Sequence, residues 1–203
     1  MKKAVIFDMD GTLWDSVDEI VESWNKTCPE MHIRREQLIG LMGKTMDCFA
    51  KELLSEYKLD EAMEIIHACE RDENEYLSHV GAKLYGDIRK VFETLRDMGY
   101  EIGIVSNCQA GYIEVFLKSS GLGKYFRGHL CFGDTGLEKH DTILKLMNTY
   151  HLKDTVYVGD TMGDFLSCRK AGIPFVFASY GFGDVPEPDY RISRPADLTK
   201  LFG

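Results

Sequence analysis

Residues 3–13 have the sequence KAVIFDMDGTL, in which an apolar run stops at an acidic turn. The β-branched and aromatic residues up to Phe7 predict a buried strand, and the Asp8-Met9-Asp10-Gly11 segment predicts a tight polar turn after it. Asp8 therefore lies at the carboxyl end of the predicted strand. Asp10 follows two residues later, and side chains at this spacing point the same way on an extended chain.

Strands and helices alternate along the second half of the chain. A helical face begins at Ile88 and ends at Gly99; strands are then expected at 101–105, 129–132, 155–158 and 174–178, with helices at 112–118, 142–150 and 165–171. This alternation predicts an α/β fold, a Rossmann-like doubly wound parallel sheet. Ligands bind such sheets beyond the carboxyl ends of the strands, where four loops are expected to meet: 8–15, 106–109, 133–139 and 159–164.

The segment from 17 to 81 breaks this alternation. It has no strand signal and predicts helices near 17–27, 35–41, 46–57 and 61–79. We expect a helical cap domain at residues 17–81, inserted after the first strand. Residues 1–16 and 82–203 are expected to form the α/β core domain.

Composition limits the classes of partner. The formal charge of −9 makes the surface repel polyanions, which argues against nucleic acid and anionic membranes. No apolar run reaches the length of about 18 residues needed to span a bilayer, and the amino-terminal apolar stretch is too short for a signal peptide. The 6 cysteines lack the spacing of a zinc or redox site. We expect a cytoplasmic protein with reduced thiols, either a monomer or a homodimer.

A second acidic pair, Asp160 and Asp164, follows another predicted strand. On neighbouring parallel strands this pair would meet Asp8 and Asp10. Unit charges about 4 Å apart repel by roughly 4 kcal/mol at an effective dielectric near 20, so the cluster needs a cation or shifted pKa values. A donor set made of oxygen alone favours Mg²⁺ over Zn²⁺, and Mg²⁺ commonly binds carboxylates together with substrate phosphate.

A D-x-D pair alone is a weak signal, because aspartate is common in turns. Its weight comes from the longer pattern of Asp8-Met9-Asp10-Gly11-Thr12-Leu13 with Ser106-Asn107, Lys139 and Gly159–Asp164. This pattern resembles the four motifs of the haloacid dehalogenase superfamily, specifically its capped phosphatases of the phosphoglycolate phosphatase and β-phosphoglucomutase branch. The resemblance covers about 3–15 and 84–203, while the cap matches only in position and helical character.

The resemblance implies Mg²⁺-dependent hydrolysis of a small phosphorylated metabolite, such as phosphoglycolate or a sugar phosphate, through an aspartyl-phosphate. Asp8 is then the nucleophile, and Asp10 protonates the leaving oxygen before activating water. Ser106 and the Asn107 backbone hold phosphoryl oxygens, and Lys139 offsets charge on the nucleophile and the transferring group.

The implied Mg²⁺ ligands are Asp8, the carbonyl of Asp10 and Asp160. For Asp164, a role in holding water or Lys139 is favoured over direct ligation. His140 stands where the family commonly has proline, and its contact with substrate is the less favoured alternative to a solvated side chain.

The loop at residues 41–45 resembles the loop between cap helices that such enzymes use to select substrates. Gly43 permits a tight turn, and Lys44 is placed to reach a substrate carboxylate or second phosphate, although an ordinary connection with an exposed lysine is equally consistent. Trp14 and Trp24 are expected to pack the core against the cap.

Three other functions are alternatives to a phosphatase. A dehalogenase of this superfamily lacks a carboxylate two residues after the nucleophile, so Asp10 argues against it. A phosphomutase of the β-phosphoglucomutase type shares every motif and stays open. A non-catalytic phosphate-ligand sensor also stays open, because fold alone does not fix function, but it gives no reason to keep the charged cluster.

Overall fold

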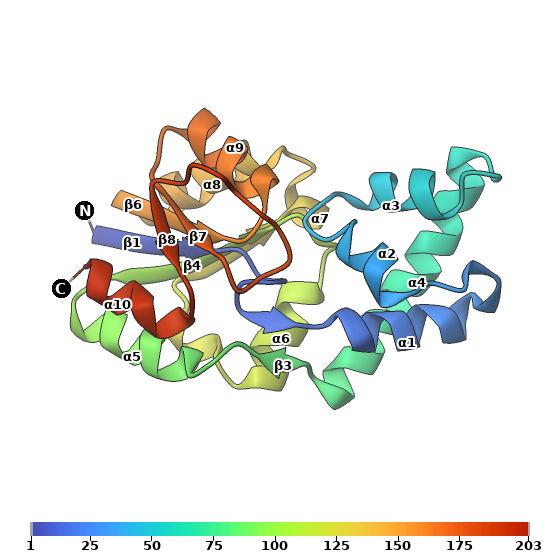
Figure 1. Ribbon diagram of the computed structural model, residues 1–203, viewed down its shortest axis with the longest axis horizontal. Coiled ribbons are helices and arrows are strands. Elements are labelled where there is room, and N and C mark those ends of the chain that lie inside the picture. The colour runs from blue at the N-terminus through green and yellow to red at the C-terminus, as the bar shows by residue number, and fades with distance from the viewer. Residues whose placement is uncertain (1, 203) are drawn as a thin grey trace.

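The computed structural model describes residues 2–202 and contains a six-stranded parallel sheet with helices on both faces (Figure 1). The strand order is β5-β4-β1-β6-β7-β8, and each neighbouring pair is parallel. The strands are β1 (Lys2–Phe7), β4 (Glu101–Ser106), β5 (Gly128–Cys131), β6 (Leu152–Gly159), β7 (Phe175–Ala178) and β8 (Tyr190–Ile192). The predicted α/β doubly wound fold is confirmed.

The central strand β1 supplies side chains to both faces of the sheet. Val5 and Phe7 join one apolar cluster, while Ile6 joins another on the opposite face. Successive side chains along a strand point to opposite faces of the sheet. A strand that is covered on both faces therefore has a continuous run of apolar residues. The apolar run before Asp8 therefore reflects two-sided burial.

Helices of the second half cover these two faces. In Figure 1, α8 and α9 lie on one side of the sheet, and α5, α6 and α10 lie on the other. The helices are α5 (Ile88–Asp97), α6 (Tyr112–Ser120), α7 (Phe132–Thr135), α8 (Lys139–Tyr150), α9 (Met162–Ala171) and α10 (Leu198–Leu201), with short 3-10 helices at Pro29–Met31, Gly123–Tyr125 and Pro195–Asp197.

Four helices form a block beyond the carboxyl ends of the strands (Figure 1). They are α1 (Val17–Thr27), α2 (Arg35–Ile39), α3 (Met46–Leu53) and α4 (Leu59–Val80). The chain enters this helical block through β2 (Trp14–Asp15) and leaves it through β3 (Lys83–Leu84), and these two strands pair antiparallel.

Several boundaries differ from the sequence prediction. The strand expected at 129–132 ends at Cys131, because Phe132 begins α7, and the helix expected at 46–57 ends at Leu53. Helix α8 begins at Lys139, ahead of the expected position 142, since its polar first turn carries no apolar period. The strands β2, β3 and β8 were not expected, because each is too short to show an alternating pattern.

Within residues 2–202, no helix is both long enough and apolar enough to cross a bilayer.

The burial of the helices gives a first prediction. Leu95 of α5 is fully buried, whereas Leu166 of α9 is 53% exposed. We expect Leu95→Ala to lower the free energy of unfolding by about 2–5 kcal/mol, because it removes buried methyl groups and leaves a cavity. The matched helical control Leu166→Ala should change it by less than about 0.5 kcal/mol. Urea unfolding measures both; equal losses would contradict the assignment of the core.

Candidate active site

The carboxyl ends of three adjacent strands bring the predicted residues together. Asp8 follows β1, Ser106 ends β4, and Asp160 follows β6. Lys139 enters from the first turn of α8, and Asp164 from the first turn of α9. All five side chains are buried. Parallel strands end at one edge of the sheet, so residues far apart in the sequence become neighbours there.

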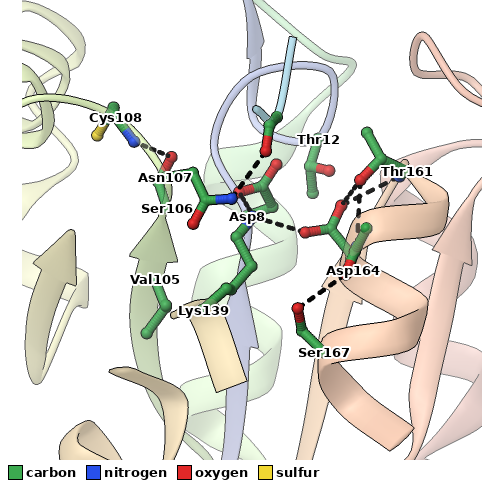
Figure 2. Close-up of polar contacts among 12 residues, drawn as sticks. Asp8, Thr12, Val105, Ser106, Asn107, Cys108, Lys139, Thr161, Asp164 and Ser167 are labelled. Atoms are coloured by element: carbon green, nitrogen blue, oxygen red, sulfur yellow. Dashed lines mark hydrogen bonds and ion pairs between the residues drawn. The ribbon is translucent and has the colours of Figure 1, made fainter. Parts of the chain in front are cut away.

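Lys139 lies between two of these carboxylates (Figure 2). Its Nζ is 2.9 Å from Asp8 Oδ1 and 2.6 Å from Asp164 Oδ1. Burial alone would lower the pKa of Lys139, but the negative charges of Asp164 and Asp8 outweigh it and raise that pKa. The lysine is therefore a permanent ammonium ion, and its position at a helix start is explained by these two partners.

Asp164 is held by both of its oxygens. Oδ1 accepts from Lys139, while Oδ2 accepts from the Thr161 backbone at 3.0 Å and from the Thr161 hydroxyl at 2.7 Å. Thr161 returns the interaction by capping the amino end of α9. Asp164 thus fixes the direction of Lys139 and joins it to the start of the helix.

Asp160 is enclosed by backbone from two loops. Its Oδ2 accepts from the Phe182 amide at 2.7 Å, and Thr12 Oγ1 lies 3.4 Å from Oδ1. A Cβ atom on Gly11, which has a φ of 77°, would lie 2.1 Å from Asp160 Oδ2, and one on Gly181 would lie 2.5 Å from the same atom. Only glycine fits at these two positions.

The acidic cluster has the composition of a divalent-metal site. Asp8, Asp160 and Asp164 each place a carboxylate oxygen within 4.8 Å of the others. Burial raises the pKa of Asp8 to about 7, with the charge of Asp164 adding to the effect and that of Lys139 opposing it. Burial, followed by the charges of Asp164 and Asp8, also holds the pKa of Asp160 well above its usual range. One ammonium ion leaves negative charge uncompensated, so the residues fit a hard cation.

Asp10 is oriented by three donors that meet on one oxygen. Its Oδ1 accepts from Trp14 Nε1 at 2.8 Å, from Ser16 Oγ at 2.7 Å and from Tyr112 OH at 2.8 Å. No residue in the described part of the chain donates to Oδ2. The burial of Asp10 raises its pKa, and these three hydrogen bonds work against that rise. Three hydrogen bonds therefore anchor the carboxyl group through one of its oxygens.

Three other residues that the sequence singled out lie outside the acidic cluster: Asn107, Lys44 and His140. Asn107 Nδ2 donates to the Gly43 carbonyl at 2.8 Å, which joins the β4 loop to the helical block. Lys44 lines a small cavity between the β4 loop and the helical block, but its ammonium lies 3.7 Å from Glu52 and is partly exposed. His140 Nδ1 lies 3.2 Å from Glu138, at the surface start of α8.

A small, partly open cavity lies between the acidic cluster and the helical block. It encloses about 30 Å³, room for about two water molecules. Asp8, Asp10, Ser106 and Asn107 lie on the sheet side. The helical side is mainly apolar: Ile20, Trp24, Met42, Met46 and Phe49.

Glu73 of α4 lines this cavity and was missed from the sequence. It is 3% exposed. One oxygen accepts from Gln109 Nε2 at 2.9 Å, and the other accepts from Trp24 Nε1. Trp24, which was expected to pack core against cap, packs on Phe49 of α3 and lines the cavity between the sheet and the helical block. A glutamate in an acidic helix carries no sequence signal of burial.

Tyr112, Ser16 and the loop at 180–183 were also missed. The loop carries Gly181 and Gly183 directly after β7, which is a usable signal for close backbone approach. The hydroxyl groups of Tyr112 and Ser16 give no such sequence signal, because their contacts with Asp10 form only in the folded chain.

The chain is similar to known proteins in sequence and in fold. A sequence profile of the haloacid dehalogenase-like hydrolases matches residues 5–178. The chain is 26% identical to a phosphoglycolate phosphatase of Aquifex aeolicus, over 98% of this chain and 96% of that protein. It is 25% identical to a pyrophosphatase of Anoxybacillus flavithermus, over 98% and 96%. A haloacid dehalogenase-like family hydrolase from Streptococcus pneumoniae shares the fold with a TM-score of 0.82 at 22% identity, covering 100% of this chain and 99% of that one.

The buried Glu73 predicts a pH dependence of stability. Burial raises the pKa of Glu73 from its ordinary 4.5 to about 8, so the folded state holds more protons than the unfolded state between these values. The stability of the wild type should therefore fall, relative to Glu73→Gln, as the pH rises from 4.5 to 8, by at most about 1.4 kcal/mol per pH unit. Urea unfolding of both proteins across this range measures the difference; parallel curves would show that the carboxyl ionises normally.

Proposed function

The chain belongs to the haloacid dehalogenase-like hydrolase family as one of its phosphatases, and we propose that it transfers the phosphoryl group of small metabolites first to Asp8 and then to water. One observation carries the proposal. Asp8 lines the cavity with Oδ1 bound by Lys139, while no described residue donates to Oδ2. A fixed carboxylate with one free oxygen is the arrangement that a nucleophile requires.

In the first step, an oxygen of Asp8 forms a bond to phosphorus, and the bond from phosphorus to the leaving oxygen breaks. Asp10 gives its proton to that leaving oxygen. In the second step Asp10 takes a proton from water, the water oxygen bonds to phosphorus, and the bond to Asp8 breaks. Inorganic phosphate and the unmodified Asp8 result.

The other residues stabilise the charge that develops on phosphorus. Ser106 and the Asn107 backbone would donate hydrogen bonds to phosphoryl oxygens, and Lys139 would balance charge on Asp8 and the transferring group. Lys139 is supported in this role by its burial and its two ion pairs. Tyr112, Ser16 and Trp14 would keep Asp10 aimed at the leaving oxygen.

We propose that Mg²⁺ binds to Asp8, the Asp10 carbonyl and Asp160. Asp164 would stay outside this set, because Lys139 and Thr161 already occupy its oxygens. When bound, the cation would lower the repulsion between the carboxylates and the phosphate dianion. The all-oxygen donor set supports Mg²⁺ over Zn²⁺.

The substrate would be a small phosphorylated metabolite of the phosphoglycolate or sugar phosphate type. The names of the relatives support the phosphoglycolate type. Residues 17–81 would act as the cap that selects it, with Gly43 shaping the cavity wall and Lys44 at its rim. A cytoplasmic monomer or homodimer is in keeping with the 6 free cysteine thiols.

The nucleophile gives the central test. Asp8→Asn should lower kcat/KM on p-nitrophenyl phosphate with Mg²⁺ by at least about 1,000-fold, because an amide cannot form the acyl phosphate. The control Asp97→Asn, at the exposed end of α5, should keep wild-type activity. Activity is followed as phosphate release, with glucose 1-phosphate isomerisation assayed in parallel for a mutase.

Two results would count against this proposal. Turnover by Asp8→Asn near the wild-type rate would remove the nucleophile. Wild-type activity that survives chelation of divalent ions would remove the metal.

Asp10 gives an independent prediction. Asp10→Asn keeps an Oδ1 acceptor for Trp14, Ser16 and Tyr112, so the variant should fold, but it cannot supply a proton. An alkyl phosphate, whose leaving alkoxide needs that proton, should lose about 100-fold or more in kcat/KM, and an aryl phosphate about tenfold. Equal losses on both esters would contradict the role of general acid.

A further inference from the structure

We propose that the cavity selects phosphate esters whose alcohol carries a hydrogen-bond donor, an ammonium or hydroxyl group, and rejects alcohols that carry a carboxylate or second phosphate. Glu73 is the specificity-determining residue. The inference rests on the proposed phosphatase activity and narrows its substrate class from the phosphoglycolate or sugar phosphate type to the sugar phosphate side, because phosphoglycolate is carboxymethyl phosphate.

Glu73 is the buried acid on the helical side of the cavity. Asp8 and Asp10 face it from the sheet side. No lysine, arginine or histidine in residues 2–202 forms an ion pair with Glu73. Leaving a carboxyl group buried without a cation is unfavourable unless a ligand interacts with it. Burial raises its pKa to about 8, and an ammonium ion beside it would favour the ionised carboxylate.

Four donors on the helical side and floor of the cavity are already occupied. Trp24 Nε1 and one N–H of Gln109 are bound to Glu73. Tyr112 OH is bound to Asp10, and one N–H of Asn107 is bound to the Gly43 carbonyl. A substrate carboxylate entering here would lose water without gaining a matching set of donors. A substrate donor would instead find the carboxyl oxygens of Glu73 and the free oxygen of Asp10.

Lys44 is the one cationic side chain among the described residues that line the cavity. Its side chain is 46% exposed, and its ammonium lies 3.7 Å from Glu52. Solvent and this partner screen its charge at the rim. Glu73 is buried, so water screens its interaction with a ligand only weakly, and it outweighs the lysine in the choice of leaving group.

Four esters of two-carbon alcohols test the proposal, because they differ only in the terminal group: 2-aminoethyl, 2-hydroxyethyl, ethyl and carboxymethyl phosphate. Each is assayed for phosphate release with Mg²⁺. The wild type should hydrolyse the aminoethyl or hydroxyethyl ester with a kcat/KM at least about tenfold above that of the carboxymethyl ester. Comparison of these two donors identifies which one Glu73 prefers. The ethyl ester should fall between donor and carboxylate.

The variant Glu73→Gln should lower the donor-to-carboxylate ratio by about tenfold, mainly through KM, because Glu73 touches none of the reacting atoms. The matched control is Glu70→Gln on the same helix. Glu70 is bound to His67 at 2.7 Å and lies outside the catalytic cavity. This control should keep the wild-type ratio.

A wild type that prefers carboxymethyl phosphate would overturn the inference, whether or not Glu73→Gln folds. An unchanged ratio in a folded Glu73→Gln protein would do the same. If none of the four esters and no p-nitrophenyl phosphate is hydrolysed, the phosphatase proposal itself fails, and the inference fails with it.

Discussion

The ion pairs of Lys139 with Asp8 and Asp164 are the interaction on which the site depends. All three side chains are buried, so their attraction is barely weakened by water. With Asp160 included, three carboxylates share one ammonium, which leaves an excess of negative charge among buried side chains. That excess fits a divalent cation. In the proposed reaction, the same charge balance would place a phosphate group beside Asp8.

The sheet makes this arrangement possible. Neighbouring strands β4, β1 and β6 end at the same edge, so each needs to supply only one or two polar residues. Glycines complete the geometry: at Gly11 and Gly181 the backbone approaches Asp160 more closely than any side chain would permit. Helix α9 contributes Asp164 through a capping interaction, which ties the start of the helix to the direction of Lys139.

The sequence predicted the sheet, the four helices of residues 17–81 and the loops that carry Asp8, Ser106, Lys139 and Asp160, because apolar periodicity and turn residues are local signals. Glu73, Tyr112 and the loop after β7 were not predicted. Their importance lies in partners distant in the sequence, and a buried glutamate in an acidic helix looks like a solvated one. Trp24 shows the same limit: its size indicated burial, but its partners Phe49 and Glu73 could come only from packing.

The paired strands β2 and β3 have a mechanical consequence. Both covalent crossings between the sheet and the helical block lie side by side, so the block is attached along a single line. Elsewhere it is held by the packing of α4 on α6 and by hydrogen bonds such as Asn107 to Gly43, Gln109 to Glu73 and Asn74 to the Ala110 carbonyl. Asn107 and Gln109 also line the cavity. The amide groups that form part of its wall therefore also fasten the block to the sheet.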